Sequence, residues 1–254
     1  MLRKLLLRIY GPQVEHLIDR EAELRILRRL AKKRIGPRML GTFTNGRFEE
    51  YFHARTLKPQ DLRDPATSKQ IAKRMRELHE GIELLDEERD GGPFVWKNWD
   101  SWMDRCEKVV TYIDQQVMLE DDGNSEICSE FKKRGLVCGT DWKFFKRTVE
   151  KYRIWLDEQY GGADRLREQL VFAHNDVSLT EIVALCYAYT LQTQYGNILR
   201  LEPPGESPLL LPANQHKQLV VIDFEYSNAN MPGLEFANHF VSYTDTGHLR
   251  HLLT

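Results

Sequence analysis

The chain has 254 residues, of which 41% are hydrophobic and 29% are charged, a balance that is typical of a soluble globular protein. Its formal net charge of -2 excludes a general basic surface for nucleic acid or anionic lipid. No apolar run approaches the roughly 20 residues that span a bilayer, so we expect no membrane insertion. The four cysteines form no CxxC pair and indicate no zinc site, so a reducing, cytoplasmic location is expected.

The first 55 residues predict a small lobe that contains a sheet. Leu5–Tyr10 is a short apolar run that a Gly-Pro pair ends, which is typical of a strand. Apolar residues then recur at helical spacing over Gln13–Lys33. Two further strands, Met39–Thr44 and Arg47–Phe52, flank Asn45-Gly46, which is a strong hairpin signal.

The rest of the chain up to residue 240 predicts a mainly helical lobe. Helical segments are expected at Pro59–His79, Trp96–Met118, Trp142–Tyr160 and Ala163–Leu170. The order of strand, helix, two strands and then mostly helices indicates an α+β protein with two lobes, residues 1–55 and residues 56–240.

Two acidic motifs follow β-rich runs in this second lobe. The first is His174-Asn175-Asp176, and the second is Asp223-Phe224-Glu225. Phosphoryl transfer from ATP needs one carboxylate that takes the acceptor's proton, and an amide oxygen and a second carboxylate that hold magnesium. Kinases supply these groups as His-x-Asp-x4-Asn followed by an Asp at a strand end. A lone His-Asn-Asp most often marks a turn, but two such motifs in this order favour a kinase.

Several segments resemble the choline/ethanolamine kinases, and the fungal choline kinases look most similar. The segments are His174–Asp176, Gln194–Asn197, Val221–Tyr226 and Leu234–Phe240, together with Leu6–Gly11 and Gly46–Phe52 upstream. The resemblance covers about residues 5–240. It implies a protein-kinase-like two-lobed fold, and it implies ATP-dependent phosphorylation of choline or ethanolamine as the first step of the nucleotide-activated route to phosphatidylcholine or phosphatidylethanolamine.

The resemblance also implies roles for the acidic motifs. Asp176 would be the base on the hydroxyl of choline or ethanolamine. Asn197 and Asp223 would bind Mg²⁺ and complete the catalytic set. Glu225 and Tyr226 would line the alcohol pocket, since aromatic faces and carboxylates attract a quaternary ammonium group.

Four residues of the small lobe would bind ATP in the same way. Arg8 would contact the phosphates and Glu23 would orient it. Glu49 and Glu50 lie in the segment that resembles the strand leading to the adenine site. An arginine in an apolar strand requires a carboxylate or phosphate partner, whereas Glu23 on a charged helix could equally be solvated. The implied partners are ATP and the small alcohol, with no nucleic acid, and a homodimer is a further expectation.

Two alternatives stay open at this point. One is a related small-molecule phosphotransferase of the aminoglycoside type, because such enzymes share both acidic motifs. The other is a catalytically inert fragment of a choline kinase. No glycine precedes Arg8, so the small lobe is expected to be incomplete, without the first two strands and the glycine-containing phosphate loop.

The catalytic loop departs from the family pattern. Asn197 follows Asp176 by 21 positions, where the kinase signature has 5. Removing the 16 residues Val177–Gln192 restores the motif, and the edges of this segment resemble a translated intron. A similar Val-Ser pair begins at Val241, after which we expect a non-native tail, residues 241–254, and a C-terminally truncated large lobe.

The intron hypothesis makes a testable prediction about the messenger RNA. Sequencing the spliced transcript should yield a message that lacks the codons for Val177–Gln192 and continues past residue 240 with an aromatic-rich helix. A spliced message that still encodes Val177–Gln192 would refute the hypothesis for the insertion, and one that ends with the present tail would refute it for the terminus.

Overall fold

A computed structural model describes residues 4–11, 18–33, 35–119, 132–133, 135–176, 196–203 and 205–241. The chain divides into two compact units, one of residues 1–88 with 170–254 and one of residues 89–169. The mixture of helices and sheets confirms the α+β class. The division into units does not coincide with a boundary near residue 55, so the lobes 1–55 and 56–240 stay predictions. The expected insertion 177–192 and nearly all of the expected tail 241–254 lie outside the described residues.

The first unit contains a three-stranded antiparallel sheet in the order β1-β3-β2, as the hairpin signal indicates. Its strands are β1 (Leu5–Ile9), β2 (Met39–Phe43) and β3 (Gly46–Glu50). A side chain at Gly46 would lie 2.3 Å from the backbone oxygen of Arg8, so glycine permits the close approach of β1. Arg8 pairs with Arg47, which places both side chains on one face together with Glu49.

Two further small sheets lie in the same unit. One has the order β4-β6-β7 and the other pairs β5 with β8. Their strands are β4 (Ala54–Thr56), β6 (Ile198–Leu201), β7 (Leu219–Val221), β5 (Val171–Ala173) and β8 (Asn228–Asn230), and the 3₁₀ segments Pro208–Leu210 and Pro212–Gln218 precede β7. Strands of three or four residues are too short to show a period, which is why the sequence pattern did not reveal β4, β6 and β8.

Two helices differ from their predicted bounds. α1 (Arg20–Lys33) begins after Asp19, whose Oδ1 accepts a hydrogen bond from the Ala22 backbone N–H at 3.0 Å. Residues 18 and 19 are not helical, and residues 13–17 of the predicted helix lie outside the described residues. The predicted helix over 59–79 is split into α2 (Pro59–Leu62) and α3 (Pro65–Gly81). The split is explained by Asp64, which caps α3 by accepting from the Thr67 N–H at 2.9 Å, because the residue before a proline is disfavoured in a helix.

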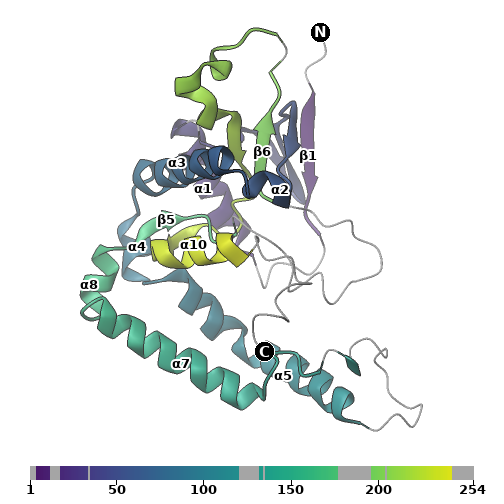
Figure 1. The fold of residues 1–254 in the computed structure, drawn as a ribbon, viewed down its shortest axis with the longest axis vertical. Coiled ribbons are helices and arrows are strands. Elements are labelled where there is room, and N and C mark those ends of the chain that lie inside the picture. Colours follow the sequence, from purple (N-terminus) through teal and green to yellow (C-terminus); the bar gives the residue numbers. More distant parts are fainter. Residues whose placement is uncertain are drawn as a thin grey trace. The chain divides into compact units, whose positions relative to one another are not determined.

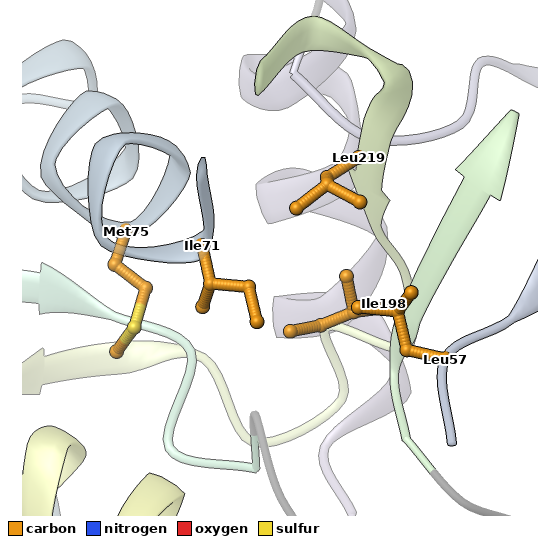
Figure 2. Close-up of a cluster of buried hydrophobic side chains, with 5 residues drawn as sticks. All are labelled: Leu57, Ile71, Met75, Ile198 and Leu219. Carbon is orange, nitrogen blue, oxygen red and sulfur yellow. The ribbon is translucent and has the colours of Figure 1, made fainter. Parts of the chain in front are cut away.

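A hydrophobic cluster joins α3 to the β4-β6-β7 sheet (Figure 2). Its members are Leu57, Ile71, Met75, Ile198 and Leu219, all at most 3% exposed. Phe236 of α10 (Pro232–Val241) packs against the cluster. β5 contacts both α3 and α10 (Figure 1), so the strand that leads to His174 is fixed from two sides.

The second unit is helical, as its sequence predicts. It contains α5 (Phe94–Met118), α7 (Trp142–Gln159) and α8 (Ala163–Glu168), whereas the short α4 (Asp86–Asp90) was not foreseen and begins in the first unit. Met103, Val110 and Trp142 form its core cluster. Among the described residues, no helix combines the length and the apolar character needed to cross a bilayer.

Candidate active site

The loop after β5 joins the two acidic motifs through a buried histidine. The His174 Nδ1 accepts a hydrogen bond from the Asp176 backbone N–H at 3.2 Å, and its Nε2 lies 2.9 Å from the Ile222 carbonyl oxygen. Complete burial lowers the pKa of His174, so the ring is neutral and its single proton lies on Nε2. The ring therefore fixes the backbone before Asp176 against the end of β7.

Asp176 and Asn197 meet although 20 residues separate them in the chain. The Asn197 Nδ2 donates to the Asp176 backbone oxygen at 2.7 Å and to its Oδ2 at 3.2 Å. The Asn197 carbonyl oxygen accepts from the Ile222 N–H at 2.9 Å, which ties this residue to the second motif as well. The three segments thus converge as a kinase-like site requires.

Arg8 and Asp223 also come together. Asp223 follows the end of β7 with a positive φ of 68°, an uncommon backbone conformation for a residue with a side chain. Arg8 Nη1 lies 3.4 Å from Asp223 Oδ1, and Arg8 Nε lies 3.0 Å from Glu49 Oε2. The predicted phosphate contact and the predicted metal ligand are therefore neighbours.

The predicted pairing of Glu23 with Arg8 is wrong. Glu23 Oε1 lies 2.8 Å from Arg47 Nη2, and Arg47 Nε lies 2.6 Å from Glu49 Oε1, so Glu49 takes the place beside Arg8. Arg47 is only 2% exposed; its Nε donates a hydrogen bond to Glu49, and its Nη2 forms an ion pair with Glu23. Although burial lowers its pKa, Glu23, Tyr10 and Glu49 together outweigh that effect, so the pKa of Arg47 is raised and its charge is retained.

Arg20, at the start of α1, extends this network and was not foreseen. Its Nη1 lies 2.8 Å from Glu23 Oε2 and 3.2 Å from Glu225 Oε2. Its guanidinium group also lies over the Tyr10 ring, 4.6 Å from the centroid. The alternation of β3 could have indicated Arg47, because Arg47 and Glu49 share a face, but no sequence signal indicated Arg20.

The carboxylates of the site influence one another. Carboxylate oxygens of Glu23, Asp223 and Glu225 lie within 4.8 Å of one another. Burial, with the charges of Asp223 and Glu225, raises the pKa of Asp176 to about 7. Burial and the charge of Asp223 raise the pKa of Glu225, and burial raises that of Tyr226 to about 12.

Glu50 lies apart from these residues. It follows Glu49 in β3, so its side chain occupies the opposite face of the sheet. It forms a bidentate pair with Arg38 at 3.0 and 3.2 Å in an exposed setting. A role for Glu50 in ATP binding stays a prediction.

Comparison with known proteins identifies the family of the chain. A family model described as choline/ethanolamine kinase matches residues 1–249. The chain belongs to this family. The matched range ends past residue 240, where we expected the resemblance to stop.

Two relatives illustrate the extent of the likeness. The choline kinase of Saccharomyces cerevisiae is 34% identical over 94% of this chain and 42% of its own length. The structure of an ethanolamine kinase from Plasmodium vivax has a TM-score of 0.58 and 23% identity, and the match covers 98% of this chain and 57% of that one. The chain thus has the fold of these kinases and spans about half the length of the relatives that it matches.

The buried network predicts a large cost for removing its central cation. Arg47→Met should lower the free energy of unfolding by about 3–5 kcal/mol, because it leaves the buried Glu23 and Glu49 without this partner. Arg38→Met is the matched control, since its pair with Glu50 is exposed and contributes at most about 1 kcal/mol. Urea unfolding measures both changes, and equal effects would contradict the assignment.

The raised pKa of Asp176 predicts a pH-dependent stability. The pKa of its carboxyl is about 7 in the folded chain, against an ordinary value of 3.8, so stability falls as pH rises between these values. In metal-free buffer, Asp176→Asn should therefore stabilise the protein at pH 8 by on the order of a few kcal/mol, at about 1.4 kcal/mol per pKa unit. The gain should vanish near pH 4.

Urea unfolding at both pH values checks this prediction. Asp164→Asn serves as control, because the Asp164 side chain is 96% exposed and surface changes typically stay within about 0.5 kcal/mol. A stability change in Asp176→Asn that is the same at pH 4 and pH 8 would show that Asp176 is not desolvated.

Proposed function

We propose that this protein transfers the terminal phosphoryl group of ATP to the hydroxyl group of choline or ethanolamine. The observation that carries the proposal is the meeting of Asp176 with Asn197 beside Asp223, across three segments that are distant in the chain. This is the arrangement of base and metal ligands that phosphoryl transfer requires. The phosphorylated alcohol would then serve phospholipid headgroup synthesis.

Asp176 is the base in this mechanism. Its carboxylate would accept a hydrogen bond from the alcohol hydroxyl and take the proton as the oxygen attacks the phosphorus atom. A pKa of about 7 suits this task, because a general base is most effective when its pKa lies near the working pH. The Asn197 amide donates to the same carboxylate and thereby orients it.

The remaining polar groups suit a magnesium–nucleotide complex. Carboxylate and amide oxygens are the ligands that Mg²⁺ prefers, and Asp223 and Asn197 supply them. Because the Asn197 nitrogen is used by Asp176, its amide oxygen is the atom left for the metal. Bound Mg²⁺ would neutralise phosphate charge. Arg8, which pairs with Glu49 and Asp223, would contact the phosphates.

Glu225 and Tyr226 are the proposed residues of the alcohol site. Glu225 is half-buried and carries an anionic group for an ammonium ion, although Arg20 competes for it at 3.2 Å. Tyr226 offers an aromatic face, which a quaternary ammonium favours. The backbone oxygen of Tyr226 accepts from the Asn175 Nδ2 at 2.9 Å, which holds this pair near the catalytic loop.

A turnover assay tests the proposal. The full chain and a version that lacks Val177–Gln192 are incubated with ATP, Mg²⁺ and choline, ethanolamine or an aminoglycoside, and the phosphorylated product is measured. We expect phosphocholine or phosphoethanolamine, with higher turnover in the shortened version because catalysis is sensitive to displacements of about 1 Å. Asp176→Asn should lower kcat by at least about 100-fold, whereas Asp164→Asn should not.

Three outcomes would overturn the proposal. Transfer that survives in Asp176→Asn would show that another group is the base. Transfer to the aminoglycoside alone would indicate the other class of phosphotransferase. The absence of transfer from both versions would identify an inert member of the family.

A further inference from the structure

A buried glutamate in α10 holds the peptide groups that precede Asp176. Glu235 is 1% exposed, and its Oε1 accepts hydrogen bonds from the backbone N–H groups of His174 at 2.6 Å and Asn175 at 3.3 Å. Asn175 has a positive φ of 64°, so the backbone turns sharply between these two groups and Asp176. A carboxylate that accepts from both N–H groups fixes that turn.

The second oxygen of Glu235 is bonded to another helix. It forms a short hydrogen bond with Nε2 of His79, which lies in the last turn of α3. The His79 side chain is only 8% exposed, and its ring makes an edge contact with Phe236, with the centroids 6.0 Å apart. Glu235 therefore links α3, α10 and the catalytic loop.

His79 completes the set of partners that a buried carboxylate needs. Burying a charge without hydrogen bonds or a counter-charge is costly. Among the side chains that the structure describes, His174 is a second ionisable ring close to Glu235, and the lowered pKa of His174 keeps it neutral. His79 is thus the side chain that bonds the oxygen left over by the loop.

We propose that His79 and Glu235 are positioning residues for the reaction: His79 orients Glu235, and Glu235 holds the backbone of His174 and Asn175 so that Asp176 faces Asn197. Neither side chain bonds to Asp176 itself. The inference concerns the catalytic geometry and so rests on the proposed kinase activity, but the tie between helix and loop can be measured without turnover.

The test compares His79→Ala with His216→Ala in the full chain. His216 is the matched control, because its Nε2 lies 2.9 Å from Glu77, which also belongs to α3 but bonds to none of the described residues of the catalytic loop. Amide hydrogen exchange at residues 174 and 175 should become at least about tenfold faster in His79→Ala and stay unchanged in His216→Ala. His79→Gln, which retains an N–H donor, should restore most of the protection.

Kinetics provide the second readout. His79→Ala should lower kcat about tenfold or more with little change in the KM for ATP, because the base is displaced while the nucleotide contacts are kept. An inactive wild type would refute the kinase proposal and leave the exchange test intact. Equal exchange at residues 174 and 175 in wild type and His79→Ala would overturn the positioning role. So would a general acceleration across α3 and α10, which indicates a purely structural role.

Should His79→Ala fail to fold, Glu235→Met gives the same answer, since it keeps the length of the side chain and removes both acceptor oxygens. Exchange at residues 174 and 175 should then rise while α3 and α10 stay protected, and unchanged exchange would overturn the proposal.

Discussion

The site depends on one buried cation, the Arg47 guanidinium group, held between Glu23 and Glu49. Glu23 and Glu49 are at most 2% exposed. Two buried carboxylates that share a neighbour need a positive charge between them. Arg47 lies against one oxygen of each, so the second oxygen of Glu49 is left for Arg8 and that of Glu23 for Arg20. A buried ion pair is weak evidence for net stability, but here it determines the direction of two further arginines.

Arg8 and Arg20 connect this buried network to the second acidic motif. Arg8 of β1 forms a salt bridge with Asp223, and Arg20 of α1 forms one with Glu225. These two pairs connect β1 and α1 to the motif after β7. Burial and the charges of Asp223 and Glu225 raise the pKa of Asp176 to about 7, and the hydrogen bond from Asn197 opposes this rise. The arginines, the proposed metal ligands and the proposed base are therefore parts of one electrostatic system.

The sequence predicted the parts of the site that are local. The hairpin around Asn45-Gly46 and the two acidic motifs are encoded in short segments, and the structure brings Asp176, Asn197 and Asp223 together as expected. Ion-pair partners depend on register and side-chain direction, which a single sequence does not display. That is why the pairing of Glu23 was misassigned.

The unpredicted elements have similar causes. Strands of three or four residues are too short to show a hydrophobic period. The break between α2 and α3 at Asp64-Pro65 was missed because apolar residues occur on both sides of it. Glu235 was noticed only as part of a family motif, because its two backbone partners lie about 60 residues earlier in the chain.

We propose that Arg8, Asn197 and Asp223 form one binding site for a magnesium–nucleotide complex. Calorimetric titration of ATP into the full chain, with and without Mg²⁺, is the sharpest test of this site. We expect binding that requires Mg²⁺ and that weakens at least about tenfold in Asp223→Asn. Binding of equal strength with and without the metal, or in the wild type and Asp223→Asn, would refute it.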